Sequence, residues 1–217
     1  SNALQTPSGR WLVYTNTGAA TDEGGLAGTP WYNTSYNPAN PTGVSATGNK
    51  FVYSQTASLT VRPNNASRVY GDANPAFTYG ITGLINGDSL AAAVQGAPTI
   101  TTTATASSSV AGGPYAIDAA LGTLASAYNY NFTFAPGQLS INPATLTFLA
   151  DTRTREYGDP NGVLTGTLGG LRNGDTVAGI ASGEMVFATT ADIESGVGVY
   201  GIVGGGITIT SANYSTT

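Results

Sequence analysis

The sequence predicts a mainly β protein in which two similar modules follow one another, each with one short helix. Two observations predict this fold class. Apolar residues alternate with polar ones over short stretches rich in aromatic and β-branched residues, which is typical of half-buried strands. The same ordered set of motifs also occurs twice along the chain, which indicates two copies of one module.

The internal repeat sets the domain organisation. Tyr70-Gly71-Asp72 recurs as Tyr157-Gly158-Asp159, 87 residues later, and Asn-Gly-Asp recurs with the same spacing at 86–88 and 173–175. A Tyr-x-Ile motif (115–117, 200–202) and an Asn-Tyr motif (129–130, 213–214) follow in the same order. We therefore predict a leader of residues 1–57, a first repeat of residues 58–143 and a second repeat of residues 144–217. Periods this long favour modules that each have their own core.

The elements of the first repeat follow from its local pattern. Residues 89–94, Ser-Leu-Ala-Ala-Ala-Val, predict a short helix with Asp88 as its N-cap, and the glycine-containing counterpart at 176–180 predicts a poorer single turn. Strand, strand, helix and three strands is the order of a β-grasp-like module; an immunoglobulin-like β-sandwich is the alternative, although it needs no helix. The predicted strands lie at 59–61, 77–81, 115–117, 130–134 and 139–141.

The leader begins with Ser-Asn-Ala, which is typical of an expression-tag remnant, so no element of the fold is expected from these residues. We expect the rest of the leader to hold two strands, within 8–14 and 48–54, and an aromatic loop between them.

Composition excludes several function classes. Only 9% of the 217 residues are charged, the net charge is −5, and the chain contains neither cysteine nor histidine. Nucleic acid binding needs clustered basic residues, and only seven are present. Disulfides and thiolate metal sites require cysteine, and the commonest general base and zinc ligand is histidine. No apolar run approaches the roughly 18 residues of a membrane-spanning helix. We expect no metal, no cofactor, no nucleic acid and no membrane insertion.

The ordered motifs resemble a known repeat. Y-G-D-x-N-P at 70–75, G-L-x-N-G-D at 83–88 and G-x-Y-x-I at 113–117 are similar to the MBG-type (YGD-signature) repeats of large bacterial adhesins. The leader segments 8–14 and 48–54 resemble the borders of such repeats in filamentous-haemagglutinin-like proteins. The resemblance implies a β-grasp-like fold and a secreted, surface-associated adhesin fragment from a Gram-negative bacterium.

The second repeat is expected to lack its last strand, because the counterpart of 132–141 would begin at about residue 216. An open sheet edge tends to recruit another strand. We therefore expect a strand-mediated dimer through that edge.

The Y-G-D motifs have a structural and a functional interpretation. In the structural one, the tyrosine ends a strand in the core, the glycine supplies an unusual φ and the aspartate bonds the following backbone. In the functional one, Asp72 with Asp88, and Asp159 with Asp175, bind calcium. Calcium takes six to eight oxygens, so two carboxylates favour the structural interpretation. The structural motif residues are Tyr70, Gly71, Asp72, Asp88, Tyr157, Gly158, Asp159 and Asp175.

Catalysis is not expected. A carboxylate pair such as Glu156 with Asp159, or Asp192 with Glu194, is the kind that hydrolyses glycosides, but neither pair recurs in the first repeat. A glycosidase-type enzyme therefore remains a distant alternative.

The leader holds the best binding candidates. Trp31, Tyr32 and Tyr36 lie among Asn, Thr and Pro without charges, a combination suited to stacking on sugar rings. The alternative is that these aromatics fold back as a lid over an apolar core, as large aromatics usually do. The predicted function is an extracellular stalk or adhesive repeat, with carbohydrate or host-protein binding as the alternative.

Overall fold

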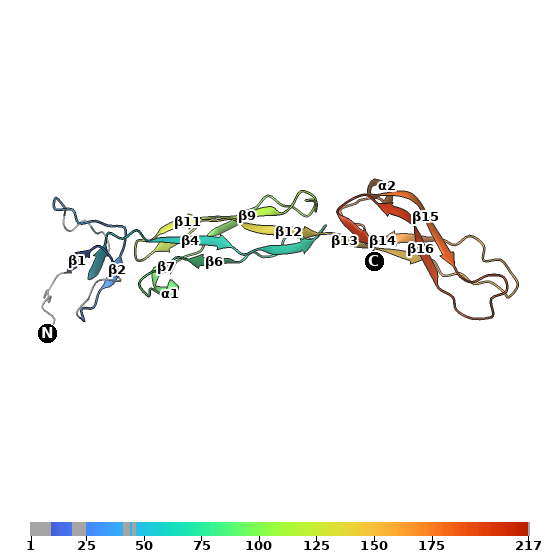
Figure 1. Cartoon of the computed structure of the whole chain (residues 1–217), viewed down its shortest axis with the longest axis horizontal. Helices are drawn as coiled ribbons and strands as arrows, with labels where there is room; N and C mark the ends of the chain where they lie inside the picture. The colour runs from blue at the N-terminus through green and yellow to red at the C-terminus, as the bar shows by residue number, and fades with distance from the viewer. Residues whose placement is uncertain (1–9, 19–24, 41–43, 45–46, 217) are drawn as a thin grey trace. The chain divides into compact units, whose positions relative to one another are not determined.

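The structure, a computed structural model, describes residues 10–18, 25–40, 44 and 47–216, and it is mainly β with two four-residue helices in that part (Figure 1). The mainly β class is confirmed. The β-grasp arrangement stays a prediction. No helix among the described residues is long and apolar enough to cross a membrane.

The chain forms two compact units that cut across the sequence repeats. Unit 1 joins the leader to part of the first repeat, and unit 2 joins the rest of the first repeat to the second. The predicted repeat boundaries at 58 and 144 therefore do not coincide with the limits of the units. Unit 1 comprises residues 1–64, 77–102 and 117–137, and unit 2 comprises residues 65–76, 103–116 and 138–217.

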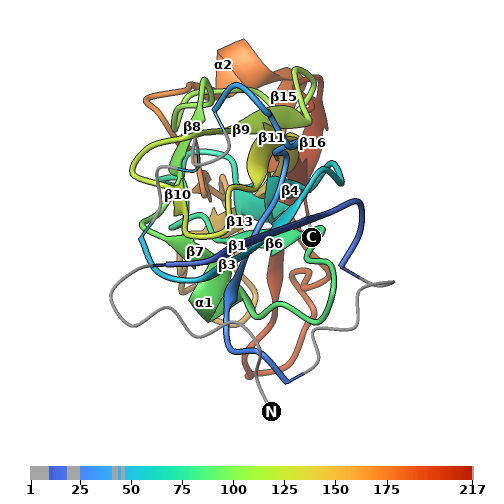
Figure 2. The ribbon, with the colours of Figure 1, turned by 90° about the vertical axis from the view of Figure 1, so that its left-hand side faces the viewer.

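In unit 1, the leader forms a parallel sheet of order β1-β3-β2. The strands are β1 (Leu12–Thr15), β2 (Thr29–Trp31) and β3 (Lys50–Tyr53). β1 and β3 lie side by side (Figure 2). All four residues of β3 are buried, as expected of the middle strand of a covered parallel sheet. β2 was not predicted, because Thr-Pro-Trp is too short to show alternation.

The first-repeat part of unit 1 is centred on β4 (Ser58–Pro63). It pairs in parallel with β11 (Asn131–Phe134) and antiparallel with β6 (Tyr79–Thr82). The other elements of this unit form two small antiparallel pairs, β7 with β10 and β8 with β9, and one helix. They are α1 (Leu90–Ala93), β7 (Val94–Gln95), β8 (Thr99–Thr102), β9 (Tyr115–Ala120, from Ile117 in this unit) and β10 (Ala125–Ser126).

Unit 2 repeats the three-stranded arrangement. β13 (Ala144–Ala150) pairs antiparallel with β14 (Gly166–Gly169) and in parallel with β17 (Tyr214–Thr216). The register is the same as in the first repeat. Val61 pairs with Ile81, and their counterparts 87 residues later, Phe148 and Leu168, pair with each other. The remaining elements are β5 (Ala66–Val69), β12 (Gly137–Asn142, from Gln138 in this unit), α2 (Val177–Ile180), β15 (Ala181–Thr189) and β16 (Ile202–Ile209). β5 and β12 are parallel, and β15 and β16 are antiparallel with an irregularity between Gly183 and Val186.

A glycine ends the edge strand in both repeats for the same reason. Gly83 and Gly170 have φ values of 105° and 95°. A Cβ on Gly83 would collide with the carbonyl oxygen of Ser58, and one on Gly170 with that of Thr145. Only glycine allows this close approach of the two backbones.

Each unit has one apolar core, and the core of unit 2 contains residues of both repeats. Tyr70 and Ile141 come from the first repeat and pack with Leu146, Leu168 and Tyr214 of the second. The expectation that each repeat encloses its own core is therefore wrong in this respect. The physical reason is size, because a module of about 85 residues buries a limited share of its apolar surface and gains stability by sharing a core.

Candidate site at the junction of the repeats

The Asn-Gly-Asp motifs form two identical tight turns. In residues 85–88, the Asp88 N–H donates to the Ile85 carbonyl oxygen at 3.0 Å, and in residues 172–175 the Asp175 N–H donates to the Arg172 carbonyl oxygen at 2.9 Å. The central residues all have positive φ, between 53° and 78°. Asn-Gly is the dipeptide that tolerates this conformation best. The turn therefore fixes each aspartate immediately before its helix.

Asp88 accepts hydrogen bonds from two tyrosines. The Tyr32 hydroxyl of the leader and the Tyr130 hydroxyl of the first repeat donate to its Oδ2 at 2.8 and 2.7 Å. The prediction that Asp88 caps the helix is wrong: Ser89 is the N-cap, and its side chain accepts from the Ala92 N–H. Asp88 is already engaged with the tyrosines, so the hydroxyl next to it takes the capping role. We call Tyr32, Asp88 and Tyr130 the leader clamp.

Asp175 is held in the same way within unit 2. Its Oδ2 accepts from the Tyr70 hydroxyl at 3.1 Å and from the Tyr214 hydroxyl at 2.7 Å. The Arg172 N–H donates to the Tyr214 oxygen at 2.9 Å, as the Ile85 N–H does to Tyr130 at 3.1 Å. Tyr70 belongs to the first repeat, so it takes the position that Tyr32 of the leader has in unit 1. We call Tyr70, Asp175 and Tyr214 the junction clamp.

Further hydrogen bonds tie each preceding segment to the repeat that follows it. In unit 1, the Asn33 side chain donates to the carbonyl oxygens of Ala57 and Asn129 at 2.9 and 2.7 Å. In unit 2, the Val110 N–H donates to Asn213 Oδ1 at 2.8 Å. Asn129 and Asn213 are the asparagines of the repeated Asn-Tyr motif, so this motif also binds the preceding segment.

The electrostatics of the clamps favour hydrogen bonding over proton transfer. Burial raises the pKa of Tyr130 and of Tyr214 to about 12, and the hydrogen bonds to Asp88 and Asp175 act in the same direction. Burial likewise raises the pKa of Tyr32. The hydroxyls therefore stay protonated near neutral pH and remain donors. Hydrogen bonds to a charged acceptor contribute about 1.5–3 kcal/mol each, so the clamps hold segments together.

The two Y-G-D motifs share a backbone conformation but differ in their surroundings. Gly71 and Gly158 have φ values of 87° and 90°, as the motif predicted. Tyr70 is 5% exposed in the core of unit 2, whereas Tyr157 is 68% exposed. The core position predicted for the tyrosine is therefore wrong for Tyr157: residues of the second repeat cover Tyr70, whereas Tyr157 belongs to neither apolar core of the described residues. The Asp72 carboxylate lies 3.6 Å from the guanidinium of Arg172, an exposed ion pair of small energetic weight.

The calcium interpretation gains no support from the geometry. Asp88 and Asp175 each lie in a clamp whose other members are tyrosines. Within the described ranges, no three His, Cys, Asp or Glu residues form a group able to hold a metal ion.

The three aromatic residues predicted for ligand binding lie in different environments. Tyr32 is fully buried, stacks on Tyr53 at 5.3 Å between ring centroids and belongs to the core of unit 1. Its ring is therefore not available to a sugar and takes the lid role instead. Trp31 is half-buried under the ammonium group of Lys50, 5.8 Å from its ring centroid. Tyr36 is 59% exposed and contacts Tyr14 edge-on at 5.2 Å.

Sequence reasoning missed the clamp roles of Tyr32, Tyr130 and Tyr214. The Asn-Tyr motif was visible at 129–130 and 213–214, and its recurrence was the signal that could have identified Tyr130 and Tyr214. Tyr32 had no comparable signal, since its partner Asp88 lies 56 residues away.

Comparisons with known proteins agree with the repeat. The family model described as MBG domain (YGX type) matches residues 59–140 and again residues 146–217. Neither a curated protein nor a solved structure matches the chain.

Proposed function

The chain belongs to the MBG domain family of YGX type, a repeat found in adhesin-like extracellular proteins, and on this premise we propose that it is a stalk segment of an adhesin. In this proposal the parent protein is secreted, resembles filamentous haemagglutinins, and presents the repeats at the surface of a Gram-negative bacterium. The repeats provide spacing and contribute to cell adhesion. They catalyse no reaction, which a turnover screen with polysaccharide substrates would test.

One observation carries the proposal: consecutive repeats share a core and a clamp instead of being joined by a free linker. The second repeat encloses Tyr70 of the first and binds its hydroxyl through Asp175. The leader enters the first repeat through Tyr32 and Asp88 in the same manner. A chain built in this way transmits force from one repeat to the next through buried contacts.

Single-molecule pulling on the full chain, held at both ends, tests whether the repeats transmit force. We expect discrete unfolding events, and we expect Tyr70→Phe to lower the force at which unit 2 unfolds. Tyr157→Phe is the matched control, because its hydroxyl lies on an exposed side chain. Extension without any force peak would exclude a stalk.

Direct ligand binding is the second candidate, and the exposure of Tyr36 is the observation that favours it. Tyr36 presents an aromatic ring next to Asn37 and Pro38 without nearby charges in the sequence. A glycan array comparing the wild type with Tyr36→Ala and Trp31→Ala tests this candidate. Loss of a glycan signal in either variant would support ligand binding. The absence of any signal in the wild type would exclude glycan binding and leave the stalk as the remaining proposed function.

A further inference from the structure

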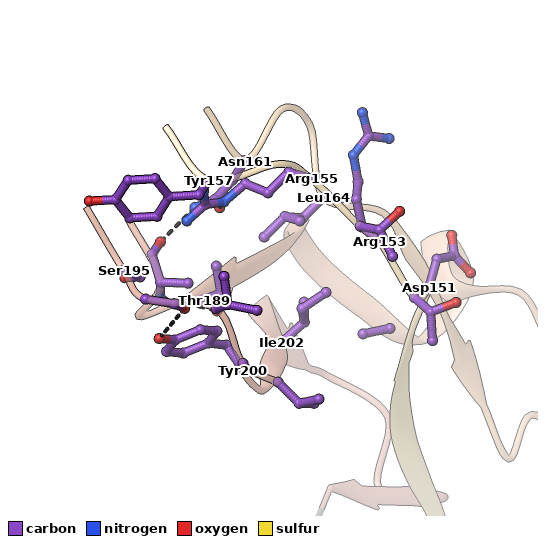
Figure 3. Close-up of a pocket in the computed structure, with 18 residues that line it drawn as sticks. Asp151, Arg153, Arg155, Tyr157, Asn161, Leu164, Thr189, Ser195, Tyr200 and Ile202 are labelled. Carbon is purple, nitrogen blue, oxygen red and sulfur yellow. Dashed lines mark hydrogen bonds between the residues drawn. The ribbon is translucent and has the colours of Figure 1, made fainter. Parts of the chain in front are cut away.

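The second repeat contains a cavity of about 560 Å³ that no clamp or core accounts for (Figure 3). It lies within unit 2, between the segment that follows β13 and the loop that leads into β16. Leu164, Tyr200 and Ile202 provide apolar surface, and Arg153, Arg155 and Asn161 provide polar groups. Its volume is in the range of sites that hold ligands.

The corresponding place in the first repeat is filled by a strand. There β12 pairs in parallel with β5, so that Leu139 faces Ala66 and Ile141 faces Arg68. The counterparts of Ala66 and Arg68, 87 residues later, are Arg153 and Arg155, and both line the cavity. Leu139 is fully buried and Ile141 is buried in the core of unit 2. The cavity therefore occupies the position that β12 has in the first repeat.

One wall of the cavity is held by the same hydrogen bonds as the corresponding segment of the first repeat. Arg68 donates to Asn74 Oδ1 at 2.8 Å and to the carbonyl oxygens of Val69 and Thr105. Arg155 donates to Asn161 Oδ1 at 2.9 Å and to the carbonyl oxygens of Glu156 and Asp192, the exact counterparts. The same hydrogen bonds thus fix the backbone in the same course in both repeats. A strand that enters the cavity would therefore meet a backbone edge that is already positioned for pairing.

Burial distinguishes the two repeats at this place. Val110 is half-buried, whereas its counterpart Val197 is 99% exposed. Tyr115 is half-buried against the core that contains Ile141, whereas its counterpart Tyr200 is 42% exposed. Residues 153–156 also form no strand pairing within the described structure, although β5 pairs at the corresponding position. The second repeat therefore presents an unfilled apolar surface beside an unpaired backbone edge.

We propose that this cavity is an acceptor site for an extended polypeptide segment with the pattern G-x-L-x-I-N, like residues 137–142. The segment pairs in parallel with residues 153–156 and inserts its two aliphatic side chains between Leu164, Tyr200 and Ile202. Backbone hydrogen bonds supply affinity in such strand addition, and the pockets for alternate side chains supply specificity. The proposal concerns this cavity alone and does not depend on the adhesin role.

A synthetic peptide of residues 136–143, Pro-Gly-Gln-Leu-Ser-Ile-Asn-Pro, tests the proposal on the full chain. Binding is measured by calorimetry, and strand formation by hydrogen exchange of the backbone amides of residues 153–156 in the absence and presence of peptide. The matched control is the same peptide with Leu139→Asp and Ile141→Asp, which keeps the length and the backbone but cannot fill the apolar pockets. On the protein side, Ile202→Ala removes part of the cavity wall.

We expect saturable binding of the native peptide, slower exchange at 153–156, and at least about tenfold weaker binding of the control peptide. Ile202→Ala should weaken binding of the native peptide and leave the exchange of β13 unchanged. No binding, equal binding of both peptides, or binding without slower exchange at 153–156 would overturn the proposal. In the last case the cavity would be a site for side chains or small ligands and not for a strand.

Discussion

Removing one hydroxyl from the junction clamp should destabilise unit 2 by a predictable amount. In Tyr70→Phe, the ring remains in the core, but the donor that lies 3.1 Å from Asp175 Oδ2 is lost. A hydrogen bond to a charged acceptor contributes about 1.5–3 kcal/mol, and Asp175 retains Tyr214 as its second donor. We therefore expect the free energy of unfolding of unit 2 to fall by about 1.5–3 kcal/mol. For a chain of this length, this lowers Tm by roughly 3–12 °C.

The second repeat offers an internal control at the same position of the motif. Tyr157→Phe removes the hydroxyl of an exposed side chain, and surface substitutions of this kind change stability by about 0.5 kcal/mol or less. Urea denaturation followed by circular dichroism measures both variants under the same conditions. A double-mutant cycle of Tyr70→Phe with Asp175→Asn isolates the pairwise energy. Equal stability of Tyr70→Phe and Tyr157→Phe would refute the assignment of the clamp.

Two further predictions concern the same elements. Gly71→Ala should destabilise the chain more than Gly158→Ala: both positions have positive φ, but only at Gly71 does a Cβ meet the side chain of Arg172, at 2.6 Å. Thermal denaturation of the two variants checks this, and equal Tm values would contradict it. Alkaline pH should weaken both units, because folding raises the pKa of Tyr130 and Tyr214 to about 12. The stability that these tyrosines contribute is complete below pH 10, the pKa of tyrosine in the unfolded chain, and is lost as the pH rises through 12. Tyrosinate absorbance and unfolding, measured together across this window, test whether the loss of stability accompanies ionisation of the tyrosines.

Local features of the fold were predictable from the sequence. Alternation placed the strands that became β4, β6, β9, β11 and β12, and the Asn-Gly dipeptides placed both turns. The helix at 90–93 was also expected, but its cap was assigned to Asp88 instead of Ser89. Both residues are good caps, and the sequence does not show that distant tyrosines occupy one of them.

The candidate site was predictable only in part. The repeated aspartates were recognised as structural residues, but their partners were not, because Tyr70 and Asp175 are 105 residues apart. The strands β5 (Ala-Ser-Arg-Val) and β8 (Thr-Ile-Thr-Thr) were missed because their sequences show little alternation between apolar and polar positions. Sharing of a core between repeats was missed for the same reason as the clamps, since it depends on contacts between distant segments.

By itself the sequence determined the strand periodicity, the twofold repetition and the left-handed turns, because each of these depends on the steric preferences of neighbouring residues. Only the tertiary structure decided which tyrosine meets which aspartate. It also decided that Tyr70 is 5% exposed and Tyr157 68% exposed within identical Tyr-Gly-Asp motifs. The physical reason is that burial is a property of whatever packs over a side chain, and that surface is supplied by residues far away along the chain.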